Sequence, residues 1–250
     1  MGMLEGKVAV VTGSSRGTGA AIARVLAREG AMVTINQVRK EGKPETVLEA
    51  ISGEGGEALF VKADITTKEG AEALVQGTKN RWGKVDILVN NYVSPIVNKP
   101  FVETTWKDCQ SQIDGTLQAA FHCCQEILKG MIERRWGRII LIGSTVIHQP
   151  RVGTHAYAVA KSAQLSFVRN LAIEYGPYGV TANLVAPGVI LTEEVAAMPQ
   201  EFRDRFIQRT PLGRIALPEE VAQTVLFFAS EMSSYVTGAY LPVNGGNLMI

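Results

Sequence analysis

The chain has 250 residues, of which 46% are hydrophobic and 20% are charged, so it can bury a large core and does not have the composition of a disordered protein. Its formal charge of +1 at pH 7 gives no basic excess, and we expect neither a nucleic acid nor a membrane as a partner. The opening residues lack the apolar stretch of a signal peptide, and the cysteines form no zinc-like set. These observations predict a cytoplasmic protein without a bound metal.

Short β-branched runs alternate with helical patterns along the whole chain. The runs typical of strands are residues 7–11, 32–36, 57–64, 84–91, 138–144, 180–188 and 239–246. Helices are predicted near residues 19–30, 45–51, 67–81 and 104–135, and a further helix contains residues 154–164. Continuous apolar strands that alternate with helices indicate a parallel sheet covered on both faces. With right-handed crossovers, we expect one Rossmann-type, doubly wound α/β domain over residues 1–250, with about seven strands.

Residues 189–220 are the longest break in this alternation and lie between the last two strands. The segment is polar, carries Pro199, Pro211 and Pro218, and contains one short helical pattern, QEFRDRFIQ. In an open α/β sheet, ligands bind beyond the carboxyl ends of the strands, where this segment leaves the sheet. We therefore expect residues 190–217 to cover the substrate. An ordinary surface excursion is the alternative.

A glycine-rich turn lies where the first strand meets the first helix. The stretch VVTGSSRGTG places Gly13, Gly17 and Gly19 at this junction. Glycine permits positive φ and lets a ligand approach the backbone closely. The helix N-terminus offers unpaired N–H groups and a partial positive charge, which suit a pyrophosphate. The position in a βα series therefore favours a dinucleotide-binding turn over a tight turn without a ligand.

The spacing GxxxGxG at this junction resembles that of the short-chain dehydrogenase/reductase family. Further matches in the order of the family are ILVNN at 87–91, YAVAK at 157–161, VAPGVILTE at 185–193 and the run from Pro218 to Gly246. Within the family, the chain is most similar to the 3-oxoacyl-acyl-carrier-protein reductases. The resemblance implies an oxidoreductase with a nicotinamide cofactor. It also implies a homotetramer assembled through the long helices and the C-terminal segment.

The resemblance further implies which residues contact the cofactor. Asp64 and Ile65 are expected at the adenine, and Asn90 along the ribose. The positions expected beside the nicotinamide carboxamide are Pro187, Gly188, Ile190 and Thr192. The glycine turn contributes Gly13, Ser15, Arg16, Gly17, Thr18 and Gly19, and Tyr157 and Lys161 complete the set.

The end of the second strand bears on the choice between NADP(H) and NAD(H). An acidic residue there would bind the ribose hydroxyls of NAD(H) and repel a 2′-phosphate. This chain has Asn36 at that point, followed by Arg39 and Lys40, and Arg16 lies in the glycine turn. A 2′-phosphate is thus expected to meet one to three cations and no carboxylate. The sequence favours NADP(H), with NAD(H) left open because Arg39 and Lys40 also suit a solvated helix start.

Tyr157 and Lys161 lie four positions apart, on one face of a helix. Carbonyl reduction by hydride needs an acid for the developing alkoxide, and a phenol can donate that proton. The reverse reaction needs a phenolate, which requires lowering the pKa of about 10 by roughly 3 units, or about 4 kcal/mol. We expect the Lys161 ammonium and a nicotinamide cation to supply this stabilisation. Ser144 ends a strand at the substrate edge and is predicted to hold the carbonyl oxygen. A hydrolase triad is the weaker reading, because Ser144 has no evident His–carboxylate set.

Two positions depart from the pattern of the family. The chain reads NNYV where NNAG is usual, so Tyr92 and Val93 replace small residues. Tyr92 could narrow the site or point outward. Thr116 stands where the family has an asparagine that holds a water beside the lysine. We expect a slower proton relay there rather than a dead enzyme.

The leading hypothesis is an NADPH-dependent ketoreductase, with Ser144, Tyr157 and Lys161 as its catalytic residues. It would transfer hydride between the nicotinamide and a carbonyl or secondary alcohol in a small molecule, with a 3-oxoacyl thioester as one candidate. An NAD-linked alcohol or sugar dehydrogenase is the alternative among enzymes. A cofactor-binding protein with decayed catalysis is a third reading. His122, His148 and His155 share no metal-binding spacing, so no metal site is expected.

Overall fold

Seven parallel strands form one twisted sheet in a computed structural model that describes residues 2–38 and 41–250. The order across the sheet is β3-β2-β1-β4-β5-β6-β7. The strands are β1 (Val8–Val11), β2 (Met32–Gln37), β3 (Glu57–Lys62), β4 (Ile87–Asn90), β5 (Gly137–Ile142), β6 (Val180–Pro187) and β7 (Tyr240–Val243). The chain winds outward from β1 in one direction and from β4 in the other, so the topological switch lies between these two strands. The predicted doubly wound sheet is confirmed.

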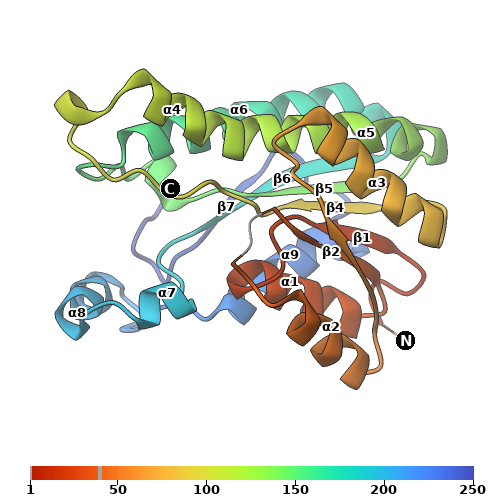
Figure 1. The fold of residues 1–250 in the computed structure, drawn as a ribbon, viewed down its shortest axis with the longest axis horizontal. Helices are drawn as coiled ribbons and strands as arrows, with labels where there is room; N and C mark the ends of the chain where they lie inside the picture. The colour runs from red at the N-terminus through yellow and green to blue at the C-terminus, as the bar shows by residue number, and fades with distance from the viewer. Residues whose placement is uncertain (1, 39–40) are drawn as a thin grey trace.

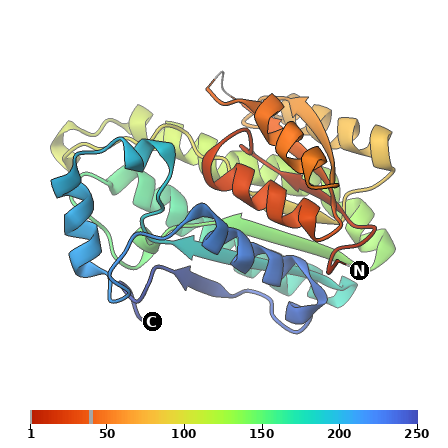
Figure 2. The ribbon, with the colours of Figure 1, turned by 90° about the horizontal axis from the view of Figure 1, so that it is seen from below.

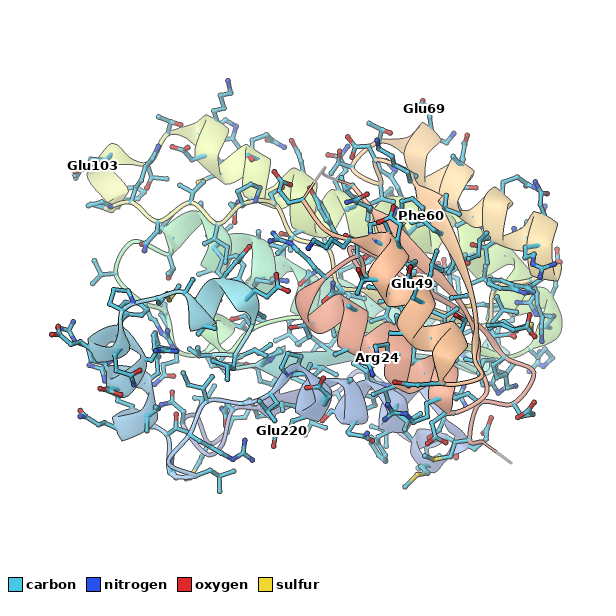
Figure 3. All side chains as sticks on the ribbon, turned by 60° about the horizontal axis from the view of Figure 1, so that its bottom comes forward. Arg24, Glu49, Phe60, Glu69, Glu103 and Glu220 are labelled. Atoms are coloured by element: carbon cyan, nitrogen blue, oxygen red, sulfur yellow. The ribbon has the colours of Figure 1, made fainter. Side chains whose placement is uncertain are left out.

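Helices cover both faces of the sheet (Figure 1). One layer contains α3 (Lys68–Trp82), α4 (Trp106–Ile113), α5 (Ala119–Arg134) and α6 (His155–Tyr175). The opposite layer contains α1 (Gly17–Arg28), α2 (Pro44–Gly53) and α9 (Pro218–Ala229). Charged side chains such as Arg24 and Glu49 lie on the outer sides of α1 and α2 (Figure 3). The strands therefore meet apolar helix faces on both sides, which explains why their sequences are apolar without alternation.

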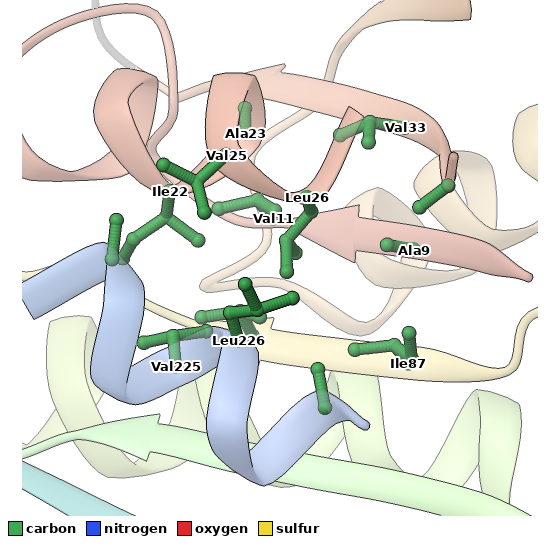
Figure 4. Close-up of a cluster of buried hydrophobic side chains, with 14 of the residues drawn as sticks. Ala9, Val11, Ile22, Ala23, Val25, Leu26, Val33, Ile87, Val225 and Leu226 are labelled. Carbon is green, nitrogen blue, oxygen red and sulfur yellow. The ribbon is translucent and has the colours of Figure 1, made fainter. Parts of the chain in front are cut away.

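Each face of the sheet has its own apolar cluster. On β1, Ala9 and Val11 face the layer of α1, whereas Val10 faces the layer of α3 and α5. Next to Ala9 and Val11, Ile22 and Leu26 of α1 pack with residues of α9, among them Leu226 (Figure 4). All of these side chains are almost fully buried. The sheet thereby lies in the middle of the molecule with both faces covered, so a ligand can reach it only at an edge such as the carboxyl ends of the strands.

The helical stretch expected over residues 104–135 is interrupted. Thr105 caps α4 through a capping box with Asp108, and a π-helical turn at Asp114–Gln118 separates α4 from α5. Gly115 lies inside this turn, so close to Ser94 that an added methyl group would overlap the Ser94 hydroxyl. The contact with the loop after β4 explains the wider turn, which helical periodicity alone does not reveal.

The segment between β6 and β7 carries the short helices α7 (Glu193–Ala196) and α8 (Gln200–Arg209). In Figure 2 the arrowheads of the central strands point toward the side of the molecule where α7 and α8 lie. The segment thus stands at the carboxyl edge of the sheet, where its sequence position led us to expect a substrate cover. Among the described residues, no helix is both long and apolar enough to cross a bilayer.

Candidate active site

One cavity of about 790 Å³ lies at the carboxyl edge of the sheet. Its walls come from the loops that follow β1, β2, β4, β5 and β6, together with α7 and α8. The predicted site residues that line it are Gly13, Ser15, Arg16, Gly17, Thr18, Gly19, Ser144, Tyr157, Gly188, Ile190 and Thr192. The structure therefore brings the glycine turn and the predicted catalytic hydroxyls to a single concave surface, as a cofactor and substrate site requires.

The glycine turn has the backbone that its sequence predicts. Gly13 and Gly17 have φ of +61° and +54°, in the left-handed region that disfavours other residues. A methyl group at Gly19 would lie 2.6 Å from Asn91 Nδ2, so this position is closed to larger residues. The N-cap of α1 is Arg16, whose side chain makes no capping hydrogen bond. The first N–H groups of α1 are thus available to an anion, and these residues fit a dinucleotide pyrophosphate.

Asn36 supports this turn from below rather than lining the cavity. It is fully buried, its Oδ1 accepts from the Gly13 N–H (3.3 Å), and its Nδ2 donates to the carbonyls of Val61 and Ala63 (3.1 Å each). The residues at the end of β2 that line the cavity are Gln37 and Val38. Neighbouring residues of a strand point to opposite faces of the sheet. Asn36 therefore supports the glycine turn from inside the protein, whereas Gln37, one position later, lines the cavity.

Several other predicted cofactor residues lie outside the cavity wall. Asp64 is exposed and closes a local turn by accepting from the Thr66 N–H and hydroxyl, whereas Ile65 is fully buried in the core. Asn90 and Pro187 are buried at the ends of β4 and β6. Arg39 and Lys40 lie outside the described residues. The contacts of these residues with a cofactor stay predictions.

Two carboxylates lie on the same cavity wall as the glycine turn, although we expected a 2′-phosphate there to meet none. Glu41 and Glu194 both line the cavity, and Glu194 of α7 makes an ion pair of 2.8 Å with Arg16. Glu194 is distant in sequence from the turn, and only the path of residues 190–217 brings it there. Arg16 therefore already has an anionic partner.

Ser144 and Tyr157 face the cavity from two elements. Ser144 follows β5, and its Oγ accepts from the Val146 N–H (3.2 Å), which leaves its own proton free to donate. Tyr157 lies in the first turn of α6 and shares a hydrogen bond with Ser144. Burial raises the pKa of Tyr157, and the bond to Ser144 lowers it by less. Tyr157 is thus held as a neutral phenol near pH 7.

Lys161 lies one turn further along α6 and is almost fully buried. Its Nζ donates to the Ile142 carbonyl (2.6 Å) and lies 5.8 Å from the centroid of the Tyr157 ring. Burial lowers the pKa of Lys161 to about 7. Burial thus has the largest effect on the pKa of both groups, and the expected lowering of the Tyr157 pKa by Lys161 and a nicotinamide cation stays a prediction.

Comparisons with known proteins agree with this geometry. The sequence model of the family described as enoyl-(acyl carrier protein) reductase matches residues 13–247. A 3-oxoacyl-acyl-carrier-protein reductase of Aquifex aeolicus (strain VF5) is 37% identical over 243 residues, which are 97% of this chain and 98% of that protein. The chain belongs to the short-chain dehydrogenase/reductase family.

Solved structures of short-chain dehydrogenases share the whole fold. An Agrobacterium tumefaciens protein described as a gluconate dehydrogenase has a TM-score of 0.93 and 34% identity, with 100% of both chains covered. A 7α-hydroxysteroid dehydrogenase, solved with NADH and 7-oxo glycochenodeoxycholic acid, has a TM-score of 0.92 and 32% identity, covering 97% of this chain and 94% of that one. This short-chain dehydrogenase/reductase is accordingly an oxidoreductase.

Thr116, one of the two departures from the family pattern, lies in the π-helical turn. It is buried, and its hydroxyl has no hydrogen-bond partner among the described residues. Its carbonyl accepts from Nε2 of Gln164 (3.3 Å), a buried residue three positions after Lys161 on α6. Sequence reasoning missed Gln164. A polar residue on the buried face of this helix was the signal that could have found it.

Tyr92, the other departure, lies on the cavity wall rather than pointing outward. A methyl group at Gly13 would lie 3.0 Å from its Cα and 3.2 Å from its Cβ, so the residue packs directly against the glycine turn. Its backbone N–H donates to the Thr12 hydroxyl (3.1 Å). Tyr92 thereby narrows the cavity beside the turn.

Proposed function

We propose that the chain is an NADPH-dependent ketoreductase. The observation that carries this proposal is the placement of Ser144 and Tyr157 on the same cavity as the uncapped N-terminus of α1. A dinucleotide whose pyrophosphate lies at that N-terminus reaches along the carboxyl edge of the sheet toward Tyr157. The proposal thus rests on one continuous surface, with a phosphate site at one end and a proton donor at the other.

The residues of this chain perform three tasks in the reduction. When bound, the nicotinamide supplies the hydride. The Ser144 hydroxyl donates to the carbonyl oxygen and orients it, and Tyr157 donates its phenolic proton to the alkoxide that forms. The raised pKa of Tyr157 suits this direction, because the phenol stays protonated at neutral pH. When protonated, Lys161 stabilises negative charge at Tyr157 after the proton has left.

The proposal of NADPH rests on the end of β2. Gln37 and Val38 line the cavity there, so β2 itself presents no carboxylate to repel a 2′-phosphate. Arg16 is the nearby described cation, and it competes for an anion with its present partner Glu194. Glu41 opposes the proposal, which is why NADH is tested beside NADPH.

The Aquifex reductase supports a 3-oxoacyl thioester as the substrate. The gluconate dehydrogenase fold neighbour supports the second candidate, an NAD-linked alcohol or sugar dehydrogenase. A protein with decayed catalysis is disfavoured, because Ser144 and Tyr157 line the cavity and Lys161 lies next to them. We also propose a cytoplasmic location, because the cysteines are free thiols, as is usual in a reducing compartment.

A substrate panel tests the proposal. It contains a 3-oxoacyl thioester, an enoyl thioester, an activated ketone and, for oxidation, gluconate, each with both cofactors and followed by nicotinamide absorbance. We expect reduction of the 3-oxoacyl thioester or the ketone, with a higher kcat/KM for NADPH than for NADH. Tyr157→Phe should lower kcat at least about 100-fold while NADPH binding is retained. Turnover of gluconate with NAD+ alone, or of the enoyl thioester alone, would replace the proposal.

A further inference from the structure

A second cavity of about 350 Å³ opens beside the first. It lies between the start of α9, the end of α8 and the loop after β7, and Glu220, labelled in Figure 3, lies on its wall. Four residues line both cavities: Arg151, Gly188, Val189 and Phe206. The two spaces thus meet at Arg151, next to the cavity that holds Ser144 and Tyr157.

Arg151 lies in the loop between these two hydroxyls, seven positions after Ser144 and six before Tyr157. Thr154 fixes its backbone, since the Thr154 hydroxyl accepts from the Arg151 N–H (3.2 Å) and donates to the Arg151 carbonyl (2.8 Å). The guanidinium stacks on Phe206 of α8, 5.0 Å from the ring centroid. The Arg151 backbone is therefore fixed by Thr154, and its planar guanidinium is held against Phe206 of α8.

Arg151 is an exposed residue whose charge has no counter-ion among the described residues. Among residues 2–38 and 41–250, no hydrogen bond or ion pair engages its guanidinium, and the charged group that shifts its pKa is another cation, Arg209. Among the described residues, none of the four glutamates that line the two cavities pairs with Arg151, and two of them are paired with other arginines. Glu220 binds Arg214 through both oxygens (2.6 Å each), and Glu194 binds Arg16. Burial and Arg209 both lower the pKa of Arg151, as expected for a cation that lacks a counter-ion.

A guanidinium without an ion-pair partner among the described residues, next to the cavity that holds Ser144 and Tyr157, is suited to bind an anionic group of a ligand. The planar guanidinium matches a carboxylate bidentately, and the aromatic face beneath it leaves its edge for that contact. A carboxylate carries one charge, which one guanidinium neutralises, whereas a phosphate dianion calls for more. We propose that Arg151 binds a carboxylate of the substrate and thereby selects oxo acids over neutral ketones. This proposal rests on the proposed ketoreductase function and narrows its substrate class.

The test compares oxo acids of increasing chain length with their methyl esters and with oxoalkyl phosphates, under the favoured cofactor. For the best oxo acid, Arg151→Gln should lower kcat/KM about 10- to 100-fold, and for its ester it should change kcat/KM less than about threefold. Arg151→Lys keeps the positive charge but not the bidentate guanidinium, so its kcat/KM for the oxo acid should lie between those of the wild type and Arg151→Gln. Arg81→Gln, on the distant surface of α3, is the matched control and should change neither.

Equal losses for acid and ester in Arg151→Gln would assign Arg151 a structural role and overturn the proposal. A wild-type preference for esters, or a larger Arg151 effect on phosphates than on carboxylates, would overturn it as well. The failure of the proposed function looks different, because then no carbonyl compound turns over with either cofactor. In that case, calorimetric binding of the same oxo acid still decides. Arg151→Gln must weaken binding at least about 10-fold, and unchanged or undetectable wild-type binding would contradict the proposal.

Discussion

Lys161 places an ammonium group where almost no water reaches it. Its only hydrogen bond among the described residues goes to the Ile142 carbonyl, and burial lowers its pKa to about 7. Burial therefore disfavours the charged form of Lys161 in the folded protein relative to the unfolded chain. A buried lysine of this kind costs folding stability in return for its position beside Tyr157.

The pH dependence of stability follows from this shift. Between pH 7 and about 10, the unfolded chain binds the Lys161 proton and the folded protein does not, so the free energy of unfolding rises with pH. Lys161→Met removes this slope. We expect the variant to be more stable than the wild type at pH 7, with a difference that shrinks toward pH 9. Each pKa unit is worth about 1.4 kcal/mol.

Urea unfolding at pH 7, 8 and 9 measures this difference. Lys79→Met, on the surface of α3, serves as a control that should show no such trend. A constant difference between wild type and Lys161→Met across the three pH values would mean that Lys161 is charged throughout.

At the residue scale, the sequence predicted the position of a side chain correctly where local spacing determines it. The four-residue spacing of Tyr157 and Lys161 fixes one helix face, and a strand end fixes Ser144. The prediction failed where a partner is distant in the chain. The sequence around Arg16 does not predict its ion pair with Glu194. Likewise, the sequence around Asn36 does not predict that its side-chain amide donates to a carbonyl of β3.

At the scale of elements, the π-helical turn between α4 and α5 packs against the loop after β4, which forms part of the cavity wall. It carries Thr116, and Gly115 lets Ser94 of the loop after β4 come into contact. The loop lines the cavity through Ser94 and Ile96, so the turn and the cavity wall are one packed unit. A change in the turn should therefore reach the cavity.

Gly115→Ala tests this coupling. The added methyl group would overlap the Ser94 hydroxyl, and we expect a loss of about 1 to 3 kcal/mol in unfolding free energy and a raised KM. Gly53→Ala is the matched control, because no atom lies within 4 Å of its added methyl group. It should be neutral or slightly stabilising. Equal stability of the two variants would show that Ser94 yields without cost.

Apolar periodicity predicted a helix over this region, and two helices with an interruption are present. The sequence contains Gly115, yet a glycine inside a helical pattern does not state which loop approaches it. That knowledge needs the register of α4 against the loop after β4, which is set by tertiary packing.

At the scale of the whole molecule, the layer of α4, α5 and α6 leaves apolar side chains outside. Phe121 of α5 is 42% exposed and lies 6.2 Å from the Phe167 ring of α6, and Ile173 of α6 is 79% exposed. At the C-terminus, Met249 and Ile250 are exposed as well. We propose that these surfaces hold a homotetramer, as the family resemblance implies.

Phe121→Glu should dissociate this assembly, because it places a charge in a buried apolar contact. Light scattering coupled to gel filtration should show tetramers of the wild type and smaller species of the variant. Gln76→Glu, an exposed change on α3, should leave the mass unchanged. A wild-type protein that elutes as a monomer would contradict the proposal.

The architecture of the sheet followed from the sequence, because strands buried on both faces are read from their apolar runs and parallel crossovers have one hand. The second cavity and its arginine did not. Both depend on how the 190–217 segment lies over the sheet edge, and a polar segment with three prolines carries no pattern that specifies its path.

The ion pair between Arg16 and Glu194 sets an order of events. It joins α7 to the glycine turn on the wall of the cavity where we propose that the dinucleotide binds. One guanidinium holds one anion well, so a phosphate bound at Arg16 would compete with Glu194 and would free α7 to move over the nucleotide. The nucleotide should therefore bind first and leave last, and the second reactant should find its complete pocket only afterwards.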